Sequence, residues 1–598
     1  ADGKAVVTKE YLEDYTGGGG SGWELLGNTG IDATVNFLGT TNNADLVFRR
    51  NNIVSGRIGT NRTSFGVNSL VNETANNDNT AIGVEALRYN TTGQFNTAVG
   101  SYALGSNISG NNNSAYGLVA LYSNSSGSGN TATGSRAIEL NTVGNNNTAY
   151  GSWALQGNQA NSGSTAIGYE AMRYADNRTS GRITYNTAVG YQALRGSTTA
   201  ANNTGRFNTA VGDQALYGNT SGNYNTAIGV LAMNSNLTAS NNTAVGYEAL
   251  TNMTQNGSNT AVGYRAMLNT STGEYNAAFG VSALAANTTG VYNTATGFQA
   301  MYRATGNRNT AHGYQALYSA VGATGNDNVA IGNASMYHNT SGSSNTALGY
   351  DSLYSNTSGN ANTVNGYQAL YLNTEGNWNT AVGIGALYNN TTANSNTAVG
   401  VDALRANTTG ASNTAIGRRA FYTGTGYSNS TAIGNEASIS ASNTVRIGNA
   451  SIANIYAQVG ITTTSDSRFK KDIQNNVPGL EFITKLNPVT YRFDARKQEA
   501  FIHKNTDYNP ADDYYPEKYD IEKITFSGFL AQDVEQAAKS IGYDFSGVDI
   551  PKNNDSYYGL RYSEFVVPLV KAVQELKAEN DELKVRLERL EKLLLEKE

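Results

Sequence analysis

The sequence predicts a mainly β protein: a long trimeric β-solenoid of the β-roll type with 17-residue coils, then a small α+β domain and a C-terminal coiled coil. Three observations support this fold class. A glycine returns at a nearly constant interval from residue 66 to residue 448. All six prolines and 45 of the 86 charged residues (40 basic plus 46 acidic) lie after residue 460. Leucines spaced seven residues apart follow near the C-terminus.

The N-terminal part divides into two short pieces. Residues 1–22 are a polar segment that ends near a four-glycine hinge at 17–20, and we expect this segment to attach the chain to another protein. Residues 23–65 alternate apolar and polar side chains, which predicts a short β module leading into the first coil.

Residues 66–460 are the repeat region. The stretch "NTAVGYQAL" at 186–194 returns as "NTAVGYEAL" at 242–250 and "NTAVGVDAL" at 396–404. Seventeen of the 22 intervals between the repeated glycines are 17 residues long. We expect two very short strands per coil, one at "T-A-V" and one at "A-L", with glycine and asparagine in the turns. So much glycine in 17 residues excludes a helical repeat.

One coil buries little apolar surface by itself. Since the chain has no cysteine for disulfides, we infer that several copies pack together. The pattern N-x-x-[AV]-[IV]-G resembles the head repeats of trimeric bacterial autotransporter adhesins over about 66–448, which implies left-handed β-rolls packed three to a fibre. The coils of those heads are usually shorter, closer to the last interval of 14 residues. The membrane anchor of that family is not part of the resemblance.

The repeat region offers few catalytic candidates. Its acidic residues are scattered over different coils, whereas a glycosidase needs two carboxyl groups about 5–10 Å apart. His312 falls in the column of valines and isoleucines. If that column faces a threefold axis, the His312 side chains of three copies could together hold an anion or a metal. The simpler interpretation is that His312 is a polar residue tolerated in this column, with water beside it. Two longer intervals, 173–186 and 195–208, predict protruding loops that suit recognition or are neutral insertions.

Residues 461–560 predict a compact α+β domain, headed by "SDSRFKKDI". Further motifs are "LNPVTYRF" at 486–493 and "GFLAQDV" at 528–534. Together they resemble the C-terminal intramolecular chaperone of phage endosialidase tailspikes, a family of self-cleaving serine peptidases, over about 461–598.

That resemblance implies a catalytic dyad, with Ser465 as the nucleophile and Lys470 as the general base, supported by Asp466 and Arg468. We therefore expect a single-turnover auto-endopeptidase without turnover of an external substrate. Residues five apart do not face one another in a regular strand or helix, so a turn or a neighbouring chain must bring them together. A lysine serves as a base only if burial or nearby cations lower its pKa. The alternative is a charged linker that caps the last coil.

Residues 561–598 predict a trimerising coiled coil. Apolar residues recur at intervals that alternate between three and four positions, as in a heptad repeat. One core column holds Leu569, Leu576, Leu583 and Leu590, and the other holds Val566, Val573, Asn580, Leu587 and Leu594. The polar Asn580 would fix the register at some cost in stability.

Neighbouring coils are nearly identical, so a copy shifted by one coil loses little contact energy. We infer that the C-terminal part trimerises first and aligns three chains. Cleavage at Ser465 then removes this aligning domain, and the persistence of the fibre becomes a matter of its unfolding rate.

The net charge of −6 argues against nucleic-acid binding as the main task, and no apolar run is long enough for membrane insertion. We expect no cofactor. The predicted function is an extracellular adhesive fibre that binds a cell-surface glycan or protein receptor, with its N-terminus docked on a baseplate or surface protein. It would be the tail fibre of a phage or phage-like injection particle, or a secreted bacterial adhesin. A tailspike-type glycan hydrolase with an inter-chain active site is the alternative, and ice binding through the threonine column is a weaker third.

Overall fold

The computed structural model describes residues 38–74, 77–504, 515–554 and 556–597. The chain divides into two units, Ala1–Thr204 and Gly205–Glu598. The predicted attachment segment and glycine hinge at 1–22 lie outside the described residues, as does the first part of the predicted β module.

The first unit begins with an antiparallel meander, which turns into a solenoid. β1 (Leu46–Arg50) pairs with β2 (Ile53–Gly59), and β2 pairs with β3 (Arg62–Phe65), both antiparallel. β3 then pairs in parallel with the first repeat strand, so the meander starts the coil stack. The following strands are β4 (Asn79–Ile82), β5 (Thr97–Val99), β6 (Ser114–Tyr116), β7 (Thr131–Thr133), β8 (Thr148–Tyr150), β9 (Thr165–Ile167) and β10 (Thr187–Val189), and a 3₁₀ turn η1 follows at Ala200–Asn202.

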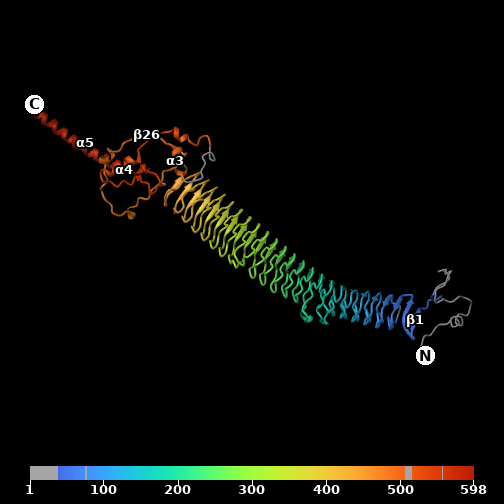
Figure 1. Cartoon of the computed structure of the whole chain (residues 1–598). Coiled ribbons are helices and arrows are strands. Elements are labelled where there is room, and N and C mark those ends of the chain that lie inside the picture. The colour runs from blue at the N-terminus through green and yellow to red at the C-terminus, as the bar shows by residue number, and fades with distance from the viewer. Residues whose placement is uncertain (1–37, 75–76, 505–514, 555, 598) are drawn as a thin grey trace, which may run out of the picture. The chain divides into compact units, whose positions relative to one another are not determined.

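The second unit repeats the pattern of three-residue parallel strands (Figure 1). Each strand is aligned residue for residue with its neighbour, as Thr226 is with Thr243. This confirms the predicted β-solenoid with 17-residue coils. Its strands are β11 (Thr209–Val211), β12 (Thr226–Ile228), β13 (Thr243–Val245), β14 (Thr260–Val262), β15 (Ala277–Phe279), β16 (Thr294–Thr296), β17 (Thr310–His312), β18 (Val329–Ile331), β19 (Thr346–Leu348), β20 (Thr363–Asn365), β21 (Thr380–Val382), β22 (Thr397–Val399), β23 (Thr414–Ile416), β24 (Thr431–Ile433) and β25 (Val445–Ile447).

The core of each coil is small and partly polar. In the coil that starts at Asn242, the side chains of Ala244, Ala249 and Leu250 are buried, and so is the asparagine itself. The Asn242 side-chain oxygen accepts a hydrogen bond from the backbone N–H of Asn259, 3.0 Å away in the next coil. Such asparagine ladders satisfy buried backbone groups that a three-residue strand cannot pair.

The repeated glycine is required by close backbone contact. Gly246 has φ +136°, and a Cβ there would lie 2.4 Å from the carbonyl oxygen of Gly263 in the next coil. Only glycine fits this conformation and this approach.

The second strand predicted for each coil, at "A-L", is wrong. In the described solenoid this segment is a turn, because residues on either side of the buried alanine adopt positive φ, as Glu248 (53°) and Leu250 (52°) do. Left-handed backbone lets 17 residues close a narrow coil, although it disfavours non-glycine residues. This turn still forms backbone hydrogen bonds to the next coil: the N–H of Leu250 donates to the carbonyl of Ala266 at 3.0 Å.

The rest of the second unit confirms the predicted small α+β region and C-terminal helix. Its core is Phe482, Val534, Ala537, Ala538, Phe545 and Phe565. The elements are a 3₁₀ turn η2 (Ser467–Phe469), α2 (Leu480–Ile483), β26 (Val489–Arg492), α3 (Ala495–Ile502), η4 (Asp520–Lys523), β27 (Thr525–Gly528), α4 (Ala531–Lys539), β28 (Val548–Asp549), β29 (Gly559–Leu560), η5 (Tyr562–Phe565) and the long helix α5 (Val566–Leu595).

Candidate functional site

Ser465 and Lys470 meet at a tight turn between the solenoid and the α+β region. The 3₁₀ turn η2 lies between them, and its first N–H groups are capped by Asp466, whose carboxylate accepts from the N–H of Arg468 at 2.9 Å. This turn folds the segment back, so that the Lys470 ammonium donates to the Ser465 hydroxyl oxygen at 2.8 Å. The local backbone therefore supplies the proximity that a spacing of five residues does not.

Asp466 and Arg468 hold the turn together. The Arg468 guanidinium forms a forked pair with the Asp466 carboxylate, at 2.9 Å from Nε and 2.6 Å from Nη2. Hydrogen bonds from the side chain and backbone of Arg468 lower the pKa of Asp466 below its usual value. Because the carboxylate stays ionised, it keeps both its cap and its ion pair. Asp466 and Arg468 thus hold the turn that brings Ser465 and Lys470 together, and the catalytic role of these four residues stays a prediction.

The dyad is exposed in the single chain. Both Ser465 and Lys470 face solvent, and burial is the main physical means of lowering the pKa of a lysine toward that of a general base. The turn thus provides alignment without desolvation. A further protein surface packed over this turn would supply the missing burial.

The dyad opens a region with a recognisable family signature. Residues 465–543 match the family model described as chaperone of endosialidase. A search of curated proteins finds no match to the chain. The match begins at Ser465 and includes β26, β27 and α4. A β-solenoid followed by an endosialidase chaperone domain fits a protein of the phage tail-fibre or tailspike kind.

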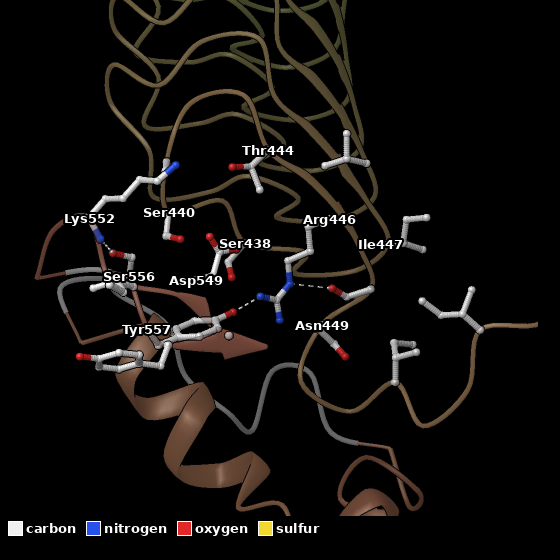
Figure 2. Close-up of a pocket in the computed structure, with 18 of the residues that line it drawn as sticks. Ser438, Ser440, Thr444, Arg446, Ile447, Asn449, Asp549, Lys552, Ser556 and Tyr557 are labelled. Atoms are coloured by element: carbon white, nitrogen blue, oxygen red, sulfur yellow. Dashed lines mark hydrogen bonds between the residues drawn. The ribbon is translucent and has the colours of Figure 1, made fainter. Parts of the chain in front are cut away.

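The α+β region contacts the last coils of the solenoid through polar side chains of residues that follow the matched segment. The Asn553 amide donates to the hydroxyl of Tyr427 at 3.1 Å and to the carbonyl of Ser440 at 3.0 Å. Arg446, in the last strand β25, donates to the hydroxyl of Tyr557. A cavity of about 690 Å³ lies between these contacts, and Figure 2 shows Arg446 and Tyr557 pointing toward one another in it.

Arg446 is a junction residue that the sequence analysis missed, although the sequence carried a signal. In β24 the middle residue is the buried Ala432, and its partner in β25 is Arg446. An arginine cannot enter a core built for alanine, so the stack of closed coils has to end there. Its guanidinium instead bonds the carbonyl of Gly448 at 3.1 Å and the α+β region.

The loops that lengthen two coils in the first unit are held by buried carboxylates. Glu170 accepts hydrogen bonds from Arg195 at 2.7 Å and from Gln192 at 2.9 Å. Although burial acts to raise the pKa of Asp176, hydrogen bonds from Arg178 lower it overall. The Glu170–Arg195 pair joins neighbouring coils at the start of the second loop, whereas the pairs of Asp176 with Arg178 and Arg182 brace the loop at 173–186 from within. Recognition by the loops stays a prediction.

The His312 side chain is exposed at the end of β17, between Thr296 and Ile331 in the neighbouring strands. Across the described ranges, no group of three or more histidine, aspartate or glutamate side chains could hold a metal ion within one chain. An ion held by three copies of His312 stays a prediction. Among the residues that the structure covers, no helix is both long and apolar enough to cross a membrane.

Proposed function

We propose that this chain forms an extracellular, homotrimeric adhesive fibre whose C-terminal domain aligns the copies and then cleaves itself at Ser465. The fibre would bind a glycan or protein receptor on a cell surface. It would be a phage or injection-particle tail fibre, with a bacterial surface adhesin as the other setting. Its N-terminal segment would dock on a baseplate or surface protein.

The observation that carries this proposal is the position of the Ser465–Lys470 turn. It stands where the solenoid has ended and the matched chaperone region begins. A cut there separates a complete coil stack from the domain that follows it. The burial that Lys470 lacks in one chain would come from the assembled trimer, so that cleavage would follow alignment and not precede it.

The exposed seam of α5 supports assembly through the C-terminal part. Leu569, Leu576, Leu583 and Leu590 are all between 45% and 61% exposed in the single chain. A row of leucines at heptad spacing is stabilised by burial against other helices. We therefore assign α5 to a coiled coil between copies.

The carboxylates of the solenoid do not favour the alternative of a glycan hydrolase. Several are engaged by arginines, such as Glu248 by Arg265 at 2.6 Å and Asp402 by Arg405. Carboxylates that are bonded to arginines are not arranged as the pair of free carboxyl groups that a glycosidase needs.

The cleavage proposal is tested by expressing the full chain and measuring its mass under denaturing conditions. The wild-type chain of 63.2 kDa should yield two fragments that part next to residue 465. Ser465→Ala and Lys470→Gln should each leave the chain intact, because they remove the nucleophile and the base. Lys471→Gln is the matched control and should cleave normally. An intact wild-type chain in an assembled trimer would contradict self-cleavage.

Receptor binding is tested separately with the cleaved fibre. Fluorescently labelled fibre should bind cells that carry the capsule or surface polysaccharide of the target and not cells from which it has been removed. Release of reducing ends from that polysaccharide would instead support the hydrolase.

A further inference from the structure

The solenoid carries an unusual surface along its glycine row. We call "apolar face" the residues directly before and directly after each repeated glycine. In the second unit this face is exposed at many positions, with Ile228 40%, Val230 42% and Ile384 53% exposed. Its other exposed apolar members are Tyr247, Tyr264, Phe279, Val281, Phe298, Tyr314, Leu348, Tyr350, Tyr367, Val399, Val401, Ile416, Ile433 and Ile447.

Charged side chains are rare on the apolar face. Between β11 and β25 only Asp213 and Arg418 are charged among the residues next to the repeated glycines. The ionic side chains of the solenoid begin one position further on, as in the pair of Glu248 with Arg265. A soluble monomer rarely exposes an apolar patch larger than a few hundred Å². A face that runs along the coils of the second unit with only these two charged side chains has the character of an interface core.

The spacing of the apolar face restricts what can cover it. The aromatic side chains on it repeat coil by coil, and neighbouring rings stack, with centroids 5.4 Å apart for Tyr247 and Tyr264 and 5.2 Å for Phe298 and Tyr314. A partner that covers many successive coils must repeat at the same spacing. A second copy of this solenoid meets that requirement.

The same chain leaves apolar side chains uncovered beyond the solenoid as well. In the segment before the dyad turn, Tyr456 is 91% and Ile461 is 95% exposed, and the leucine seam of α5 is exposed too. The apolar face, this segment and the seam therefore follow one another along one chain. Copies aligned side by side would cover all three.

The apolar face also contains rows that break the repeat. The last residue of each strand lies on this face. On adjacent strands these last residues are Phe279, Thr296 and His312, and further along Leu348 is followed by Asn365. The first unit has its own irregular rows at Tyr116, Thr133 and Tyr150. If copies met one coil out of step, a large ring would face a small polar residue, which leaves a cavity or a clash.

From these observations we propose that the apolar face is where copies of this chain meet, coil against the same coil, and that the irregular rows set the alignment. This inference rests on the homotrimer proposed above and adds the surface and its register device. The coils are thus less interchangeable than their sequence motif suggests, because the differences between them are placed on the contact surface.

The absence of cysteine from the sequence allows a direct test by single-cysteine cross-linking. Ile228→Cys places a thiol on the apolar face, and Thr238→Cys places one at an exposed position elsewhere in the same coil. Treated with a short bismaleimide, the assembled full-length Ile228→Cys protein should give covalent dimers on a denaturing gel. The Thr238→Cys protein should stay monomeric on that gel.

The alignment device is tested by exchanging two rows. A chain with Phe279→Thr and Thr296→Phe keeps its composition and matches other copies of itself, so it should assemble in normal yield. Co-expressed with a differently tagged wild-type chain, it should form mixed oligomers several-fold less often than a random mixture predicts.

The outcomes separate this inference from the proposed function. A monomer by light scattering would overturn the homotrimer and the apolar face together. An intact oligomer that cross-links at residue 238 and not at residue 228 would overturn the face alone. Random mixing of the row-exchanged and wild-type chains would overturn the alignment role.

Discussion

Asn379 belongs to the buried asparagine ladder, and the loss of stability on replacing it with alanine can be worked out from its hydrogen bonds. This side chain is 1% exposed. Its oxygen accepts from the backbone N–H of Asn396 at 3.0 Å, and its amide donates to the side-chain oxygen of Asn362 at 3.1 Å and the carbonyl of Ala393 at 2.9 Å. Asn379→Ala removes all three hydrogen bonds.

The cost follows from which groups remain without a partner. The carbonyl of Ala393 keeps a second donor, the amide of Asn390 at 3.1 Å. The N–H of Asn396 bonds to the Asn379 side chain and would be left buried without that acceptor. An orphaned buried donor costs about 1–3 kcal/mol and each of the two other lost bonds about 1 kcal/mol, so we expect local destabilisation of about 3–5 kcal/mol.

Native-state hydrogen exchange measures this loss where it occurs. Since each 1.4 kcal/mol is a factor of ten, peptides that contain residue 396 should exchange about 100- to 4,000-fold faster. Asn389→Ala, in the same coil, is the control and should leave exchange nearly unchanged, because no side-chain hydrogen bond holds Asn389 in the structure. Equal exchange in both variants would refute the ladder as a source of stability.

Three further predictions follow from the same structure. Gly246→Ala should prevent the coil from closing, because its Cβ would lie 2.4 Å from the carbonyl oxygen of Gly263, and the yield of soluble fibre should fall sharply on gel filtration. Acid should loosen the loop at 173–186: the folded pKa of Asp176 is lowered, so its stabilisation is present above the ordinary carboxyl pKa of about 3.9 and is lost as the pH falls through the folded value. Hydrogen exchange corrected for intrinsic rates should show this, and Asp176→Asn should remove the pH dependence. Deleting α5 should leave the solenoid sequence intact but reduce correctly aligned oligomers and self-cleavage, as measured by light scattering and fragment yield; normal cleavage without α5 would contradict assembly before cutting.

The solenoid was largely predictable because its constraints are local and repeated. A glycine at φ near +136° that touches the next glycine has no substitute, so the constraint is visible as a period in the sequence. The "A-L" segment misled the prediction because alanine and leucine carry no turn signal. The left-handed backbone of the leucine and of the residue before the alanine is imposed by closure of the coil, which a single repeat does not reveal.

The closeness of Ser465 and Lys470 was expected from the family resemblance, their geometry was not, and their catalytic role stays a prediction. The motif around Ser465 named the dyad, but only the capped 3₁₀ turn explains how side chains five residues apart reach 2.8 Å. The junction contact of Arg446 with Tyr557 joins residues 111 positions apart. No local pattern encodes such a partner, although an arginine in the alanine column marked the end of the stack.

By itself, the sequence determined the coil length, the glycine row and the long C-terminal helix, since each depends on spacing along the chain. Tertiary structure alone decided which side chains point inward, that "A-L" turns left-handed, and that one face of the coils stays apolar and exposed. The physical reason is that burial and exposure are properties of the closed coil and its stacked neighbours, and they exist only once the chain has wound.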